Sequence, residues 1–146
     1  MQSREKYFVL PNQSLHTIPK DIENIYFGRY GSRDLTVLDF SSFGFTHLRS
    51  ITIGCNCFHY VDSFVLDGLE KLESVKIGEG CFSGWYRQEE SICRIANCPN
   101  LRQLEIGDRS FYDFNQFELS NVSSLQSITF DESCFKYAEN CILKGK

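Results

Sequence analysis

A short apolar pattern occurs five times along the chain, and this repetition limits the possible folds more than any other feature of the sequence. Its clearest copy starts at Leu101 and continues through Leu104, Ile106 and Gly107 to Phe111. We count positions from the first residue of each copy, so these residues stand at +3, +5, +6 and +10. The other copies, which follow the pattern with small departures, start at Ile22, Leu48, Leu72 and Leu125.

The spacing of the copies predicts a solenoid. Successive copies start 26, 24, 29 and 24 residues apart, and periods of about 20 to 29 residues are typical of leucine-rich repeats and related solenoids. On a short strand, positions +3 and +5 face inward while +2 and +4 face outward. One copy cannot bury its apolar side, but stacked copies bury one another's and pair their strands as a parallel sheet. The glycine at +6 predicts a turn where a side chain would cost energy.

The segment before each copy also repeats. Apolar residues stand eight, six or three positions before the first residue of a copy. Phe40 and Phe64 both stand eight positions before a copy, so we align them with each other. The segments are rich in residues that favour strands. The expected fold is therefore mainly β, with about five coils of 24–29 residues, a parallel sheet, a second ladder of short strands on the convex side, and little helix.

We expect one domain that covers residues 1–146, because a chain of this length can bury a substantial core. Residues 22–143 carry the repeats. Residues 1–21 are less regular and the first copy lacks the phenylalanine at +10, as expected of an N-terminal cap or a degenerate repeat. No polar cap is visible after Leu143, which indicates either a longer array or an end that another chain covers.

These residues resemble a known family. The leucine-rich pattern L-x-x-L-x-L-x-x-N/C-x-L ends here in phenylalanine, and small residues stand at +9. With glycine at +6, the pattern is most similar to the BspA-like leucine-rich repeats of bacteria and protists. The resemblance implies binding of macromolecules by a curved surface. One departure is that position +8 carries asparagine only at Asn56, so we expect stacked aromatic rings in place of an asparagine ladder. The phenylalanines at +10 are Phe58, Phe82, Phe111 and Phe135.

Charge and hydropathy argue against several classes of partner. The net charge is −4, and the pI is near 5.4, whereas nucleic-acid binding requires a clustered basic surface. No apolar run approaches the length of a membrane span, and the apolar residues before Pro11 are too few for a signal-peptide core. We therefore expect no nucleic acid and no membrane. The compartment is unknown, and a cytoplasmic location is favoured if Met1 is the native start.

The cysteines and histidines do not predict catalysis. Seven cysteines are an odd number, so at least one thiol stays reduced or pairs between chains. Most of them occupy core positions of the repeat, where cysteine packs as a small apolar residue. Only Cys55 lies outside the pattern. The sequence assembles no nucleophile with a base and an oxyanion site, so we expect neither an enzyme nor a cofactor or metal.

Two groups of residues are candidates for partner binding. The outward positions of the strands offer Tyr26, Lys76, Gln103 and Glu105, on a face so polar and nearly neutral that ordinary solvation explains it equally well. An insertion within the longest period, around 83–90, offers Trp85, Tyr86 and Arg87, which are residue types enriched at binding hot spots. The alternative for Trp85 is packing, because it follows Phe82 by three residues, where other copies carry Val61, Phe114 or Ala138.

The function that we expect is a non-catalytic leucine-rich-repeat scaffold that mediates protein–protein interaction with a protein partner of unknown identity. The alternative is a structural module that forms a homo-oligomer through its uncapped C-terminal coil.

Overall fold

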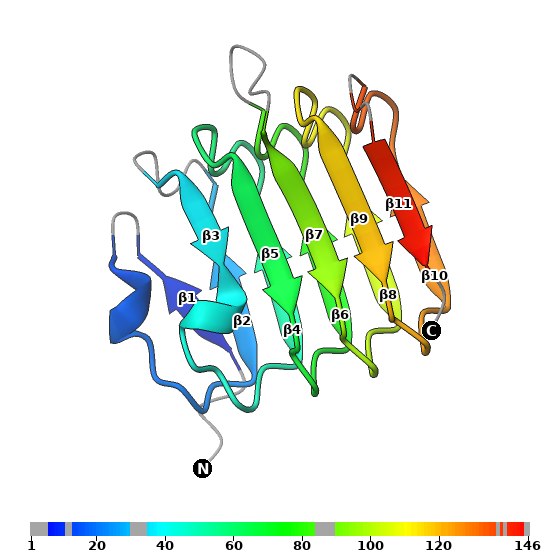
Figure 1. Ribbon diagram of the computed structural model, residues 1–146. Helices are drawn as coiled ribbons and strands as arrows, with labels where there is room; N and C mark the ends of the chain where they lie inside the picture. Colours follow the sequence, from blue (N-terminus) through cyan, green and yellow to red (C-terminus); the bar gives the residue numbers. More distant parts are fainter. Residues whose placement is uncertain are drawn as a thin grey trace.

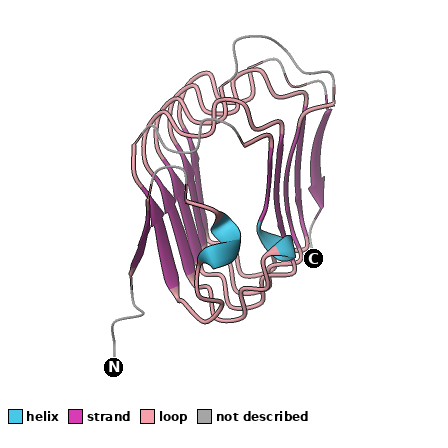
Figure 2. Cartoon of the chain, turned by 90° about the vertical axis from the view of Figure 1, so that its left-hand side faces the viewer, coloured by secondary structure: helices cyan, strands magenta, loops and turns pink. Residues whose placement is uncertain are grey.

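A computed structural model describes residues 6–10, 13–29, 35–83, 90–136, 138 and 140–144. The fold is mainly β, with two parallel sheets that face each other and almost no helix (Figures 1 and 2). Sheet A contains, in spatial order, β1 (Tyr7–Val9), β2 (Asn24–Phe27), β4 (Ser50–Ile53), β6 (Ser74–Ile77), β8 (Gln103–Ile106) and β10 (Ser127–Phe130). Sheet B contains β3 (Val37–Asp39), β5 (Ser63–Asp67), β7 (Ile92–Ala96), β9 (Gln116–Ser120) and β11 (Asn140–Lys144).

From β2 onward the chain alternates between the two sheets, and one strand of each sheet with its turns forms what we call a coil (Figure 1). In sheet A the residues at +3 lie side by side from β2 to β10. The predicted parallel sheet and the second ladder of strands are therefore confirmed. The residues at +3 that share this register are Ile25, Ile51, Val75, Leu104 and Ile128.

The core lies between the sheets, where the inward residues of both meet. Positions +3 and +5 are buried in β2, β4, β6 and β8. In β10 the same positions, Ile128 and Phe130, are 49% and 39% exposed, and among the described residues no strand lies beyond this edge. At the other end, Leu15 and Ile18 are buried. Leu15–Thr17 forms the 3-10 helix η2.

A column of phenylalanine rings runs through the turns that follow sheet A. The rings of Phe82 and Phe111 have centroids 4.5 Å apart and are nearly parallel, and Phe135 continues the column 5.0 Å from Phe111. Phe58 lies 5.4 Å from Phe82 at the other end. The prediction that stacked rings replace an asparagine ladder is confirmed. These four residues have φ between 53° and 59°, a region that bulky side chains rarely adopt.

The glycines at +6 are required by close approach between coils. Gly107 does not have a positive φ, but a Cβ atom there would lie 2.6 Å from the carbonyl carbon of Gly78 in the preceding coil. A Cβ at Gly54 would meet the backbone of Arg29 at 3.0 Å. A Cβ at Gly28, in the first coil, would have no atom of another residue within 4 Å. The predicted cost of a side chain at +6 thus arises from the neighbouring coil rather than from the turn itself.

The cysteines at +9 of the inner copies, Cys57 and Cys81, are buried in the core as expected, and the small residues at +9 are in addition hydrogen-bond donors. Cys81 Sγ donates to the carbonyl of Gly54 at 2.9 Å, and Ser110 Oγ donates to that of Gly78 at 2.7 Å. Hydrogen bonding with Cys57 and burial raise the pKa of the Cys81 thiol well above its usual value, so the thiol keeps the proton that it donates. Cys57 and Cys134 make the equivalent bonds at 2.8 and 3.0 Å.

The alignment of the first strand of sheet B was wrong by two residues. Leu38, not Phe40, pairs with Phe64. The strand ends at Asp39 because the Asp39 carboxylate accepts a hydrogen bond from the Ser41 amide and begins the 3-10 helix η3, Phe40–Ser42. This helix accommodates the two additional residues of the first coil.

Charged side chains also align between coils. Arg49, at +1, lies between Glu23 and Glu73, which occupy +1 in the coils on either side, at 4.0 and 3.5 Å. On sheet B, Arg94 contacts Asp67 at 2.8 Å and Glu118 at 3.3 Å. Exposed pairs of this kind stabilise a fold only slightly, but each one favours a single order of coils.

Candidate functional site

The outer face of sheet A is the surface on which the predicted strand residues come together. Each strand turns its +2 and +4 residues away from the core because successive side chains alternate between the faces of a sheet. Tyr26, Lys76 and Glu105 share the +4 row, and Lys76 pairs directly with Glu105. Gln103 lies in the +2 row beside Ser74. We call this surface the outer face. Its +4 row is Phe8, Tyr26, Thr52, Lys76, Glu105 and Thr129.

A pair of aromatic rings, one exposed and one half-buried, lies at the N-terminal end of the outer face. Phe8 of β1 lies directly beside Tyr26 of β2, with ring centroids 5.0 Å apart. Phe8 is 65% exposed although it is apolar. The ammonium group of Lys6 lies 5.9 Å from the Tyr26 ring. The pair combines apolar area with a nearby cation, which suits it to contact a protein surface.

Sequence reasoning missed Phe8. The residue belongs to the irregular N-terminal segment, so no repeat position identified it as an outward residue. The signal that could have found it is the apolar run from Tyr7 to Leu10 before Pro11, which is consistent with a strand at the edge of a sheet. Pairing of that strand with β2 then places Phe8 beside Tyr26. The other predicted contacts, Trp85, Tyr86 and Arg87, lie outside the described residues.

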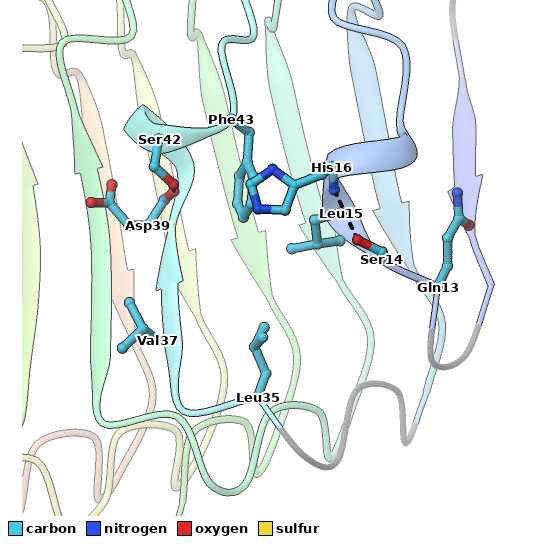
Figure 3. A pocket seen from close by; sticks show the side chains of 9 residues that line it. All are labelled: Gln13, Ser14, Leu15, His16, Leu35, Val37, Asp39, Ser42 and Phe43. Carbon is cyan, nitrogen blue, oxygen red and sulfur yellow. Dashed lines mark hydrogen bonds between the residues drawn. The ribbon is translucent and has the colours of Figure 1, made fainter.

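A pocket of about 270 Å³ lies beside β3, the edge strand of sheet B (Figure 3). The ring of His16 packs edge-on against Phe43, with centroids 4.9 Å apart. The Asp39 carboxylate on the opposite side is already hydrogen-bonded to the Ser41 amide. Apolar and capping residues thus account for most of the lining, which includes Gln13, Ser14, Leu15, His16, Leu35, Val37, Asp39, Ser42 and Phe43.

A broader, polar groove of about 760 Å³ runs across the turns that follow sheet A. It contains two acidic residues, Glu79 and Asp108, and two basic residues, Arg109 and Lys136. The enclosed Oδ1 atom of Asp108 has no hydrogen-bond partner in the described part of the chain. The balanced charges of the lining do not select a class of ligand.

The thiols and histidines of the described residues do not assemble an activated nucleophile. Burial raises the pKa of the Cys93 and Cys98 thiols, so the reactive thiolate is disfavoured there. The His47 ring forms a hydrogen bond with the Thr46 hydroxyl at 2.8 Å. Within the described ranges, no three His, Cys, Asp or Glu side chains are grouped to hold a metal ion.

Among the described residues, none of the helices is long and apolar enough to cross a bilayer. Comparisons with protein families, with curated proteins and with solved structures found no match to this chain. Its function therefore has to be argued from the surfaces themselves.

Proposed function

We propose that the chain is a non-catalytic leucine-rich-repeat scaffold of the BspA-like type, which binds another protein through the outer face of sheet A. Support for the repeat type comes from three features that recur in successive coils. They are the in-register strands, the phenylalanine column and the glycines that allow close contact. The 24–29 residue period also agrees with this class.

The observation that carries the binding proposal is the exposed ring of Phe8 beside the half-buried ring of Tyr26. An apolar ring that is 65% exposed contributes nothing comparable to the core, whereas burying it against a partner is favourable. Beyond the pair, the row continues with one hydroxyl and then with Lys76 beside Glu105. A partner is therefore expected to offer an apolar group to the aromatic pair and polar groups of either charge to the rest of the row.

The test is selection of peptide ligands for the intact protein from a displayed library of random peptides. Changing Phe8→Ala together with Tyr26→Ala should weaken a selected peptide by about tenfold or more, as expected for loss of a hot spot. Tyr60→Ala is the matched control, because Tyr60 is an exposed aromatic residue in the turn between β4 and β5. If the Phe8 and Tyr26 variant binds every selected peptide as well as the control does, the proposal is wrong.

The insertion is tested with the same peptides. Trp85→Ala with Arg87→Ala should weaken binding without lowering the melting temperature if the loop belongs to the contact surface. A fall in both binding and melting temperature would instead mean that Trp85 packs in the core.

A further inference from the structure

The charged side chains of the outer face differ from the other charged rows of the molecule. Arg49 and Arg94 each contact carboxylates of the coils on both sides. Lys76 and Glu105 are direct register partners, yet among the described residues no ion pair joins them. Lys76 is exposed and Glu105 is half-buried. Both groups are therefore available to charges of the opposite sign on a partner.

The outer face presents its chemical groups in a fixed order. From the N-terminal end, the +4 row carries the rings of Phe8 and Tyr26, then the Thr52 hydroxyl, then the ammonium group of Lys76 and the carboxylate of Glu105. Each residue is the direct register partner of the next, so the row is a line across the strands. Neighbouring strands lie about 4.8 Å apart, and a ligand along the row meets these groups at regular intervals.

These intervals match a peptide in an extended conformation. An apolar side chain placed midway between the Phe8 and Tyr26 rings, whose centroids are 5.0 Å apart, lies about 12 Å from Lys76 and about 17 Å from Glu105 at this strand spacing. Alternate residues of an extended chain face the same way and advance about 7 Å. The fourth residue from the apolar one therefore reaches Lys76 at about 13 Å, and the sixth, at about 20 Å, reaches Glu105 with a long side chain.

A helical ligand fits this face less well. A helix that binds a protein surface buries a continuous apolar stripe in a groove. Beyond Tyr26 the +4 row offers only hydroxyl and charged groups. The neighbouring +2 row is polar too, and there the Ser50 hydroxyl donates a hydrogen bond to the side-chain oxygen of Asn24. One apolar position followed by polar ones suits a chain that contacts the surface through single side chains.

We propose that the outer face binds an extended peptide segment that lies across the strands of sheet A and carries an apolar, an acidic and a basic side chain in this order. The acidic residue is the fourth from the apolar one, and the basic residue is the sixth. Because side chains make the contacts, the order holds for either direction of the peptide chain. This inference rests on the proposed function and adds the order and spacing of the charges on the partner.

The first experiment examines the peptides that the intact protein selects from the random library. Aligned on their apolar residue, they should share an acidic residue four positions away and a basic residue two positions further. A synthetic peptide in which this acid and base are exchanged should bind about tenfold less tightly, because each charge then faces one of its own sign. A separation of seven or eight residues between the apolar and acidic positions, about 10–12 Å along a helix, would overturn the proposal in favour of a helical ligand.

The second experiment exchanges the charges on the protein. Lys76→Glu with Glu105→Lys leaves composition and net charge unchanged. This variant should bind a selected peptide about tenfold less tightly, and it should bind the peptide with exchanged charges better than the wild type does. Glu70→Lys with Lys71→Glu is the matched control, because it makes the same exchange at exposed residues in the turn between β5 and β6. The control should change neither affinity, and thermal melting checks that both variants stay folded.

The outcomes separate this inference from the function on which it rests. If no peptide is selected, or if every selected peptide binds the Phe8 and Tyr26 variant as tightly as the Tyr60 control, the proposed function and this inference both fail. If the selected peptides need the aromatic pair but show no order of charges, or bind the protein with exchanged charges as tightly as the wild type, this inference alone is wrong.

Discussion

Two adjacent coils, those that start at Leu101 and Leu125, carry the same pattern but have different surroundings. Leu104 and Ile106 are 0% and 1% exposed. Ile128 and Phe130, at the same positions one coil later, are 49% and 39% exposed. Because the local strand is the same in both coils, the difference comes from the neighbouring coil, which among the described residues only the first of the two has on both sides. A coil in this molecule is therefore buried by the next coil rather than by its own residues.

The largest effect should come from a charge at +3. Leu104→Asp buries an unpaired carboxylate between two coils, and we expect it to cost about 4–5 kcal/mol or more, which unfolds most of the chain. Ile128→Asp makes the same type of change in the C-terminal coil and should cost less than about 1 kcal/mol, because water reaches the carboxylate. Urea denaturation at low protein concentration measures both. Equal losses would mean that position +3 is needed within the coil itself.

The phenylalanine column offers the second comparison. Phe111 is fully buried and stacks on both Phe82 and Phe135, so Phe111→Ala should cost about 3–5 kcal/mol. Phe135 is only half-buried and has one ring stacked on it in the column. We expect Phe135→Ala to cost about half as much in the same denaturation experiment. A larger loss at Phe135 would contradict the view that stacking with neighbours on both sides stabilises the column.

The third comparison sets an inner glycine against the first one. Gly107→Ala places a methyl group against the backbone of Gly78, and overpacking of this kind costs about 1–3 kcal/mol. Gly28→Ala meets open space and should change the free energy of unfolding by less than about 0.5 kcal/mol. Thermal melting of the two variants distinguishes contact between coils from a requirement of the turn, which would make both substitutions costly.

The fourth comparison concerns the donors at +9. Cys81→Ala leaves the carbonyl of Gly54 without its side-chain donor, and the loss of one such partner costs about 1–3 kcal/mol. Cys81→Ser keeps a donor, as Ser110 does in the next coil, and should recover most of the loss. Cys134→Ala, in the half-exposed C-terminal coil, should cost less than Cys81→Ala. No recovery with serine would mean that the thiol contributes by its volume alone.

The sequence predicted the strands, their parallel pairing and the stacked rings, but it missed two close contacts that appear only when the coils are stacked. Alternation of apolar and polar residues was enough to place Leu104 and Ile106 inward and Glu105 outward. The role of Gly107 was assigned to its own turn, because its clash with Gly78 exists only once the coils are stacked. The donor role of Cys81 was hidden for the same reason.

Local competition explains the other differences. Phe40 matched the apolar pattern, but the Asp39 carboxylate ends the strand before it by binding the Ser41 amide. Phe8 joined the candidate surface only through the pairing of β1 with β2. In both cases the pattern of apolar residues was compatible with two registers, and hydrogen bonds selected one.

The row of charges at +1 has a consequence for how such a molecule can change in length. Glutamate and arginine alternate there, with Arg102 following Glu73. Deletion of the one coil that carries Glu73 would bring Arg49 beside Arg102, whereas deletion of both the Arg49 and the Glu73 coils would bring Glu23 beside Arg102 and restore an opposite pair. Each contact is weak, about 0.2–1 kcal/mol, but its sign depends on which coils are removed. The row of charges therefore disfavours loss of the Glu73 coil alone in a way that the apolar core, which is alike in every coil, does not.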